Sequence, residues 1–367
     1  MGNPIHLIVA SNQINRIYMA TKRSTLEKMP KWLICVPLVV QWLWLGLRHG
    51  SLTLPSAANP NITAGGLVGE GKIEYFEQMG PLGRAATAPY LGLRIVDGLS
   101  EADMARALEA AHVAFPVVAK PDLGLCGYGV RKIADPNALR SYIAHFPKGE
   151  TLVLQQYLPQ EHEAGLFYAR DPHSGAGRLI GLTLRHYPRV SGDGRSTLGA
   201  LIRQDGRALR MLRSQAHACP LDLDSVPAAG QTVRLATIGS TRVGGLYRDG
   251  AALITDALTT AIDRIAREMP DFHFGRFDVR FDDVAELQAG RGFSIMEVNG
   301  AGSEAIQAWD PGTGLISGLR MIFSKQRLLF EIGAANRRRG ARPIGLQELM
   351  RLNTRQNRLI ELYPTSN

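Results

Sequence analysis

The chain has 367 residues, of which 45% are hydrophobic, so it is globular, buries a substantial core and is long enough for two or three subdomains. Lys and Arg outnumber Asp and Glu by 42 to 33, and the net charge of +9 favours an anionic partner, either nucleotide, nucleic acid or acidic lipid. Cys35, Cys126 and Cys219 lie far apart, with no CxxC pair and no ligand-like spacing to histidine. This pattern indicates neither a disulfide framework nor a zinc site, and it fits a reducing cytosol best.

The most apolar segment is WLICVPLVVQWLWLGL, residues 32–47, which carries no charge and three tryptophans. It begins too far into the chain for a signal peptide, and it is shorter than the roughly 20 apolar residues of a membrane-spanning helix. Tryptophans towards both ends and basic residues on both flanks suit a helix that lies in the headgroup region of a membrane. The alternative is a buried helix that packs on the rest of the protein.

The next two stretches differ in composition. Residues 51–72 are rich in Pro and Gly, which predicts extended chain and turns, either a linker or a loop on the substrate side. Residues 73–114 hold two helical patterns, one near 73–78 and a clearer one in SEADMARALEAAHVA. In the second pattern Ser100 is placed to cap the helix, with Asp103 at the third helical position.

From residue 115 onward, strand patterns alternate with helical patterns, which predicts an α+β class with a mixed sheet and flanking helices. A helical pattern runs from Ile316 to about Asn336, and a polar, arginine-rich end follows it. The expected strands are 117–120, 152–158, 164–170, 178–185, 275–281 and 292–299, and the expected helices between them are 195–216 and 251–268.

The stretch FPVVAKPDLGLCGYGV, residues 115–130, places a cation at the end of an apolar strand and a glycine-rich loop directly after it. Lys120 is a compact cation, and Gly124, Gly127 and Gly129 allow backbone N–H groups to approach a polyphosphate closely. The loop is neither a Walker A motif nor GxGxxG, so by itself it is equally well an ordinary glycine-rich turn.

A second group of polar residues lies inside two apolar strands, GRFDVRF and FSIMEVN. Glu297 and Asn299 are two residues apart, so they share one face of their strand, and Asp278 lies on the earlier strand. Two carboxylates and an amide oxygen are hard ligands that suit Mg²⁺ bound together with substrate phosphates. A surface hairpin with solvated acids is the alternative, although unpaired carboxylates are costly inside apolar strands.

Together, these motifs and their order resemble the ATP-grasp family, nearest to its D-alanine-D-alanine ligase and cyanophycin synthetase branches. The resemblance covers residues 115 to about 305 and implies two α/β subdomains that hold ATP between them. It divides the chain into an N-terminal segment with the apolar helix, a linker with a reduced pre-ATP-grasp region, an ATP-grasp domain and a basic C-terminal tail. These parts are residues 1–50, 51–114, 115–335 and 336–367.

The resemblance implies the residues that bind the nucleotide. Lys120 falls on the first nucleotide lysine, and DLGLCGYGV on the mobile loop that closes over the phosphates. LVLQQYL resembles the hinge that holds adenine, with Gln156 where the family usually has glutamate and with the backbone of Leu158 available to the ring. Glu163 matches the acid that binds ribose.

The resemblance also implies the residues that take part in the reaction. RHYPRVSGDGRSTLGALI places Arg185 where the family holds the transferred phosphate, and GRFDVRF places Arg276 at the developing oxyanion. Asp278, Glu297 and Asn299 become the magnesium ligands. The GAGSEA that follows Asn299 departs from the D-alanine ligase pattern, which puts D-alanine specificity in doubt and leaves the ATP and metal parts intact.

The implied activity is ATP-dependent ligation of a carboxylate to an amine through an acylphosphate, with ATP and Mg²⁺, or Mn²⁺ in its place, as cofactors. We expect Asp278→Asn or Glu297→Gln to abolish turnover with the fold intact. Ser303 and Glu304 are candidates for holding the amine, and a plain turn is the alternative.

The expected location is the cytoplasm, with the inner face of the cytoplasmic membrane as an anionic surface partner. A non-catalytic nucleotide-binding scaffold is the second hypothesis, and nucleic-acid binding ranks last because interleaved aromatics are missing.

Overall fold

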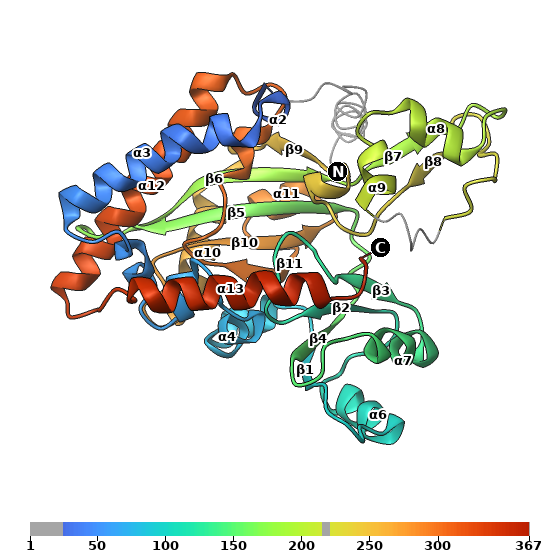
Figure 1. Cartoon of the computed structure of the whole chain (residues 1–367), viewed down its shortest axis with the longest axis horizontal. Coiled ribbons are helices and arrows are strands. Elements are labelled where there is room, and N and C mark those ends of the chain that lie inside the picture. The colour runs from blue at the N-terminus through green and yellow to red at the C-terminus, as the bar shows by residue number, and fades with distance from the viewer. Residues whose placement is uncertain (1–24, 215–220, 367) are drawn as a thin grey trace, which may run out of the picture.

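The computed structural model describes residues 25–214 and 221–366, and it contains two main antiparallel sheets (Figure 1). The larger sheet has five strands in the order β11-β10-β5-β6-β9, and the smaller has four in the order β1-β4-β2-β3. The expected α+β class is therefore confirmed. The larger sheet consists of β5 (His162–Arg170), β6 (Gly177–His186), β9 (Leu246–Asp249), β10 (Phe274–Phe281) and β11 (Phe293–Asn299). The smaller consists of β1 (Tyr90–Arg94), β2 (Val117–Pro121), β3 (Arg131–Ile133) and β4 (Thr151–Gln156).

The larger sheet is apolar on one face and polar on the other. Side chains alternate along a strand, so the phenylalanines of GRFDVRF face one side and its charged residues face the other. Phe277 and Val279 pack against Ile262 and Ile265 of α10 (Asp256–Glu268), with α5 (Pro81–Ala86) beside them. The charged side chains of β10 point to the opposite face, which is therefore available for a functional site.

The smaller sheet has its own core and its own helices. Val117, Ala119 and Leu154 pack against α6 (Glu101–Ala110) and α7 (Pro136–Ala144). The side chain of Ser100 accepts a hydrogen bond from the Asp103 backbone N–H, which confirms the expected helix cap.

A third, small lobe follows β6. It contains the two-stranded sheet of β7 (Arg189–Ser191) and β8 (Thr232–Arg234), with α8 (Leu198–Gln204) and α9 (Leu209–Ser214). The single helix expected over residues 195–216 is therefore wrong. The Asp205 carboxylate accepts hydrogen bonds from the backbone N–H groups of Arg207 and Ala208, and it starts a new turn where one helix was expected to continue.

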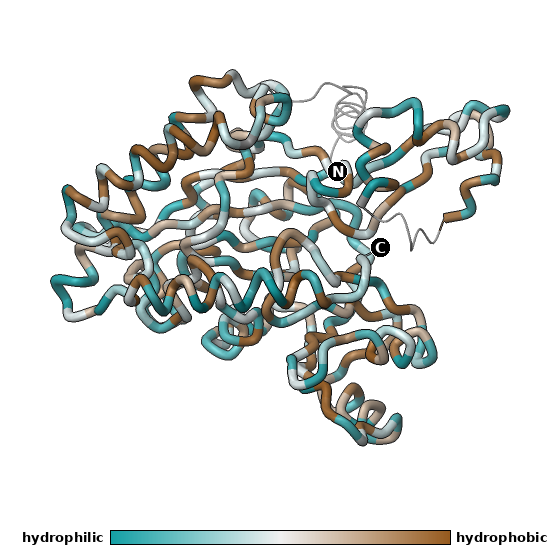
Figure 2. Tube along the Cα trace, in the orientation of Figure 1, coloured by the Kyte–Doolittle hydropathy of each residue, from teal (hydrophilic) through white to brown (hydrophobic). Residues whose placement is uncertain are grey.

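The apolar segment forms α3 (Lys31–His49), which lies beside the long helix α12 (Leu315–Arg338) on the outside of the molecule (Figures 1 and 2). The basic C-terminal region is largely helical. It forms α13 (Leu346–Leu362), whose end reaches the smaller sheet, where Tyr363 packs against that sheet's core (Figure 1). The remaining short helices are α2 (Thr25–Lys28), α4 (Lys72–Glu77) and α11 (Val284–Gln288).

The turn-rich stretch after α3 is held by one buried asparagine. The Asn59 amide nitrogen donates to the carbonyls of Gly65 and Phe274, at 3.0 and 2.8 Å. Its amide oxygen accepts from the backbone N–H groups of His273 and Phe274, at 2.9 and 3.0 Å. These four bonds fix the loop to the start of β10, so residues 51–72 belong to the same structural unit as the larger sheet.

We expect Asn59→Ala to lower the free energy of unfolding by about 3 kcal/mol, because it removes the side-chain partner of the buried N–H groups of His273 and Phe274 and of the Phe274 carbonyl. Chemical denaturation measures this change. Asn61→Ala is the matched control: Asn61 is exposed, and its loss should change stability by less than about 0.5 kcal/mol. Equal effects of the two substitutions would contradict the role of Asn59.

Candidate functional site

The register of the larger sheet brings the polar residues of three strands to one face. Asp278 on β10 lies opposite Glu297 on β11 and opposite Gly165 on β5, and Arg276 lies opposite Asn299. Residues that face each other across a ladder point to the same side of the sheet. The expected convergence of Asp278, Glu297 and Asn299 is therefore present in the structure.

Asp278 is buried between two arginines. Arg276 Nε lies 2.6 Å from one carboxylate oxygen, and Arg185 Nη2 lies 3.0 Å from the other. The Asn299 amide nitrogen also donates to the second oxygen, at 3.2 Å. Burial alone would raise the pKa of Asp278, but the charges of Arg185 and Arg276 and their hydrogen bonds outweigh it and hold the pKa below its usual value.

Glu163 extends this network along the sheet. Arg185 Nη1 lies 2.9 Å from a Glu163 oxygen, so one guanidinium bridges Glu163 and Asp278. The Tyr187 hydroxyl also donates to Glu163, and Arg280 Nε lies 3.6 Å away. The network needs a glycine in the neighbouring strand, because a Cβ at Gly165 would lie 2.9 Å from the Arg276 side chain.

Lys120 reaches this face from the other sheet. Its ammonium donates to the Gln155 side chain at 2.7 Å and to the backbone carbonyl of Met296 on β11 at 2.8 Å. Burial lowers the pKa of Lys120 to about 8, while the negative charge of Glu297 opposes this shift. Lys120 therefore joins the two sheets next to the predicted metal strand.

Lys72, at the start of α4, completes the cluster. Its ammonium lies 3.4 Å from a Glu297 oxygen and 3.2 Å from the carbonyl of Asp122. The cluster then contains three carboxylates and five cations, and the carboxylates of Asp122 and Glu70 act on Lys120 and Lys72 from beside it. Its carboxylates are Glu163, Asp278 and Glu297, and its cations are Lys72, Lys120, Arg185, Arg276 and Arg280. Five cations on one face favour an anionic ligand.

The glycine-rich loop lies beside the cluster. A Cβ at Gly124 would be 3.1 Å from the Lys72 ammonium, and Gly127 and Gly129 have φ values of 74° and 71°, which glycine adopts readily. Arg242 donates to the carbonyl of Gly127 from the opposite side. Cys126 in this loop and Cys35 are exposed free thiols, whereas Cys219 lies outside the described residues.

The predicted magnesium ligands Asp278, Glu297 and Asn299 lie on this same face. Within residues 25–214 and 221–366, no group of three or more His, Cys, Asp and Glu side chains is arranged to hold a metal. Both oxygens of Asp278 accept bonds from the arginines, whereas Glu297 pairs with Lys72 at the longer distance of 3.4 Å. The oxygens of Glu297 and Asn299 fit a Mg²⁺ ion that arrives with phosphate, while Asp278 fits as a ligand only once it releases an arginine.

Most of the site residues predicted from sequence meet at this face. The segment predicted as the adenine hinge lies at its edge. The carbonyl of Leu158 accepts a hydrogen bond from Arg280 at 3.4 Å. The Gln156 side chain instead accepts from the Ala114 backbone at 2.9 Å, and its neighbour Gln155 contacts Lys120. The residues brought together are Lys120, Glu163, Arg185, Arg276, Asp278, Glu297 and Asn299.

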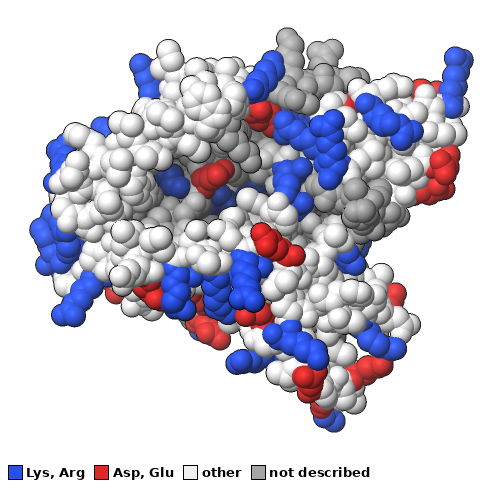
Figure 3. Space-filling model, viewed as in Figure 1, with Lys and Arg blue, Asp and Glu red and all other residues white. Residues whose placement is uncertain are grey.

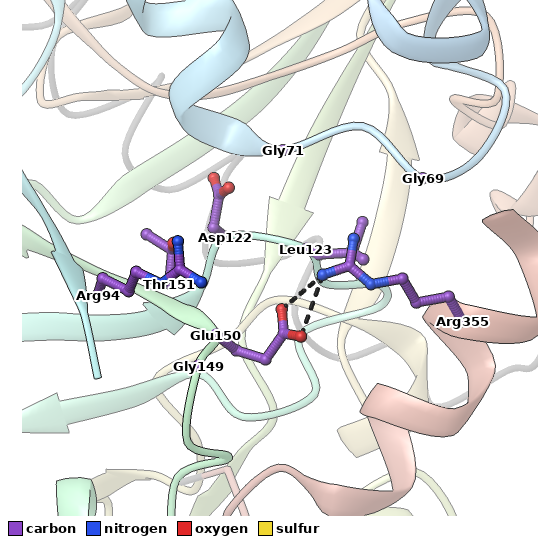
Figure 4. Close-up of a pocket in the computed structure, with 9 residues that line it drawn as sticks. All are labelled: Gly69, Gly71, Arg94, Asp122, Leu123, Gly149, Glu150, Thr151 and Arg355. Atoms are coloured by element: carbon purple, nitrogen blue, oxygen red, sulfur yellow. Dashed lines mark hydrogen bonds and ion pairs between the residues drawn. The ribbon is translucent and has the colours of Figure 1, made fainter. Parts of the chain in front are cut away.

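A surface pocket of about 240 Å³ lies apart from these residues, at the edge of the smaller sheet (Figure 4). Arg355 of α13 reaches into it and pairs with Glu150 at 2.9 Å, next to Gly71 and Asp122. Its lining contains none of the predicted site residues. In Figure 3 a separate recess opens between the α3 and α12 layer and α13, with acidic and basic groups at its floor.

No family model and no curated protein sequence matches the chain. Among solved structures, it is similar to a bifunctional glutathione synthetase from Pasteurella multocida, with 18% identity over 75% of this chain and 38% of that chain, at a TM-score of 0.39. It is also similar to a D-alanine-D-alanine ligase from Bacillus anthracis, with 14% identity over 71% and 68% of the two chains, at a TM-score of 0.38. The VanG D-Ala:D-Ser ligase from Enterococcus faecalis matches with 13% identity over 70% and 61%, also at 0.38.

The network around Asp278 changes the expectation that Asp278→Asn leaves the fold intact. Asp278→Asn leaves two buried arginines without their shared carboxylate, so we expect it to lower the free energy of unfolding by about 3 to 5 kcal/mol. Glu297→Gln, whose side chain is 30% exposed, should cost less than about 1 kcal/mol. Chemical denaturation of both variants checks this difference, and an Asp278→Asn protein as stable as the wild type would contradict the network.

Proposed function

We propose that the chain is an ATP-grasp ligase that joins a carboxylate to an amine through an acylphosphate, forming an amide or peptide bond and releasing ADP and phosphate. One observation carries the proposal. A lysine from the smaller sheet and arginines from the larger sheet meet at one polar face. A triphosphate offers oxygen acceptors to these cations, and the glycine-rich loop at this face leaves its backbone close to them.

The order of residues along the site suggests how ATP lies. The carbonyls of Leu158 and Gln160 are next to Arg280 at one end, which suits the adenine ring. Glu163 comes next and suits the ribose, whose hydroxyl replaces one of the present contacts of this carboxylate. The triphosphate then extends towards Lys120 and Arg276. Each group of the nucleotide has a complementary partner in this order.

The protein contributes positioning and charge to the two steps of the reaction. In the first, an oxygen of the substrate carboxylate attacks the γ-phosphorus while the bond to ADP breaks. In the second, the amine attacks the acyl carbon and phosphate leaves. Arg185 and Arg276 stabilise the negative charge on the transferred phosphoryl group and on the oxyanion. Glu297 and Asn299 would hold a Mg²⁺ ion, which would further neutralise the phosphate oxygens.

We expect Lys120→Ala to weaken binding of a fluorescent ATP analogue about 10- to 100-fold, because it removes a charge-assisted hydrogen bond worth about 1.5 to 3 kcal/mol. Lys148→Ala is the control, because Lys148 is an exposed residue that pairs with Asp97. Phosphate release is then measured with ATP, Mg²⁺ and mixtures of acids and amines. The ligase proposal requires release that depends on both an acid and an amine.

The second hypothesis, a non-catalytic nucleotide-binding scaffold, gives a different result in the same assay. It predicts normal binding of the ATP analogue with no release of phosphate for any pair of acid and amine. Unchanged binding by Lys120→Ala would contradict both hypotheses, because both place the nucleotide at this lysine.

The outer face of α3 supports a second proposal, that this helix lies on an anionic membrane surface. Its exposed apolar residues follow helical spacing, with Leu47 82% and Trp32 68% exposed. The other face is attached to α12, where Gln41 donates to the Phe323 carbonyl at 2.8 Å and Trp42 packs against Phe330. By length and composition, α3 is the one helix in the described chain that could cross a membrane. Its attachment to α12 favours a helix lying on the surface over one that crosses.

Sedimentation with vesicles tests this proposal. We expect the protein to bind vesicles that contain phosphatidylserine and to bind neutral phosphatidylcholine vesicles more weakly, since basic residues flank α3. Leu47→Glu should reduce binding at least tenfold, because it places a charge in the apolar face. Leu346→Glu is the control, since Leu346 is an exposed apolar residue of α13. Equal binding by both variants, or no binding by the wild type, would contradict the proposal.

A further inference from the structure

The C-terminal segment, residues 346–366, lies against the glycine-rich loop that follows β2 (Figure 1). The Tyr363 hydroxyl, directly after α13, donates to the Leu123 carbonyl at 2.6 Å. The Gln356 amide nitrogen of α13 donates to the Gly124 carbonyl at 3.5 Å. The backbone of Gly129 also approaches the segment closely, since a Cβ at Gly129 would lie 3.1 Å from the Tyr363 Cβ. The segment therefore contacts the loop near both of its ends.

The segment is itself held by the smaller sheet. The Tyr363 ring stacks on Phe146 of that sheet's core, with a distance of 5.5 Å between the ring centres. Arg131 on β3 donates to the Thr365 carbonyl at 2.6 Å and to the Thr365 hydroxyl at 2.8 Å. Contacts on its ring and on the chain that follows it therefore keep the Tyr363 hydroxyl at the Leu123 carbonyl.

A second donor reaches the same loop from the turn between β8 and β9. Arg242 donates to the carbonyls of Cys126 and Gly127, at 3.3 and 3.2 Å. Its Nη2 also donates to the Ser366 hydroxyl at 2.7 Å. Arg242 is thus joined to the C-terminal segment, and the two together hold carbonyls along the length of the loop.

Hydrogen bonds to the loop's carbonyls fix the direction of its N–H groups. The loop's peptide bonds are trans, because the cis bond in the described chain precedes Pro116. In a trans peptide the C=O and N–H groups point in opposite directions. The carbonyls of Leu123 and Gly124 point to the C-terminal segment, so the N–H groups of Gly124 and Leu125 point away from it. A Cβ at Gly124 would lie 3.1 Å from the Lys72 ammonium, so this part of the loop borders the charged cluster.

We propose that the C-terminal segment is a strap that positions the glycine-rich loop for the phosphates of the nucleotide, with Tyr363 and Arg242 as positioning residues. The inference rests on the proposed binding of ATP at this face. Neither side chain needs to touch the nucleotide, because each holds loop carbonyls on one side so that loop amides on the other side meet phosphate oxygens. A loop without the strap would have to become ordered when the phosphates bind, and this loss of entropy would weaken binding.

The test separates the triphosphate from the rest of the nucleotide. Binding of AMP-PNP and of AMP to the full chain is measured by competition with a fluorescent ATP analogue, with Mg²⁺ present. Tyr363→Phe keeps the stacked ring and removes only the hydroxyl. We expect it to weaken AMP-PNP binding about three- to tenfold, as for the loss of one hydrogen bond, and AMP binding by less than about 1.5-fold. Arg242→Met should weaken AMP-PNP binding at least as much.

Tyr168→Phe is the matched control, because it also removes one tyrosine hydroxyl. This hydroxyl donates to Asp263 of α10 at 2.6 Å, on the opposite face of the larger sheet from the charged cluster. The control should leave the ratio of the AMP-PNP and AMP affinities unchanged. The inference is overturned if Tyr363→Phe alters this ratio no more than the control does, and nucleotide binding at the face would then still stand.

Hydrogen exchange of the wild type gives a result that does not depend on how a variant folds. AMP-PNP with Mg²⁺ should slow exchange of the amides of residues 123–130 at least about tenfold, and AMP should not. Without nucleotide, the same amides should exchange faster in Tyr363→Phe than in the wild type. Equal exchange in these comparisons overturns the inference alone. A wild type that binds neither AMP-PNP nor the fluorescent analogue contradicts the proposed function, and the inference with it.

Discussion

The contact of Asp278 with Arg185 and Arg276 is the constraint on which the polar face depends. Charged groups inside a sheet are costly unless they are paired and hydrogen-bonded, and this carboxylate pairs with Arg276 of its own strand and with Arg185 of β6. Arg185 continues to Glu163, so the pairing extends over three strands. Five cations therefore line one face, and an anion is the kind of ligand that they favour.

The same contacts show which hydrogen bonds must be replaced when a ligand binds. Lys120 donates to the Met296 carbonyl and Glu163 is fully occupied by its neighbours, so a nucleotide has to exchange these bonds for its own. The glycine-rich loop is held from two sides, by Arg242 and by the Tyr363 hydroxyl, which donates to the Leu123 carbonyl. On the proposed function, binding of ATP would exchange one set of paired charges for another and leave no buried charge alone.

The period of two along strands allowed part of the polar face to be predicted from sequence. It placed Glu297 and Asn299 on one face, and the same rule applied to GRFDVRF adds Arg280 to that face. Register within a sheet also determines which of two adjacent residues makes a given contact. Here Gln155, and not Gln156, contacts Lys120. Lys72 lies on a helix far from the motifs. Only tertiary packing brings it to the face, so no local pattern could identify it.

The central claim is that a triphosphate lies between the two sheets. A crystal structure of the protein with AMP-PNP and Mg²⁺ tests it most directly. The account predicts phosphate oxygens within hydrogen-bond distance of Lys120 and Arg276, adenine at Leu158, and the metal on Glu297. A nucleotide bound elsewhere, for example in the pocket beside Arg355, with the Asp278 network unchanged and Lys120 still on Met296, would contradict it.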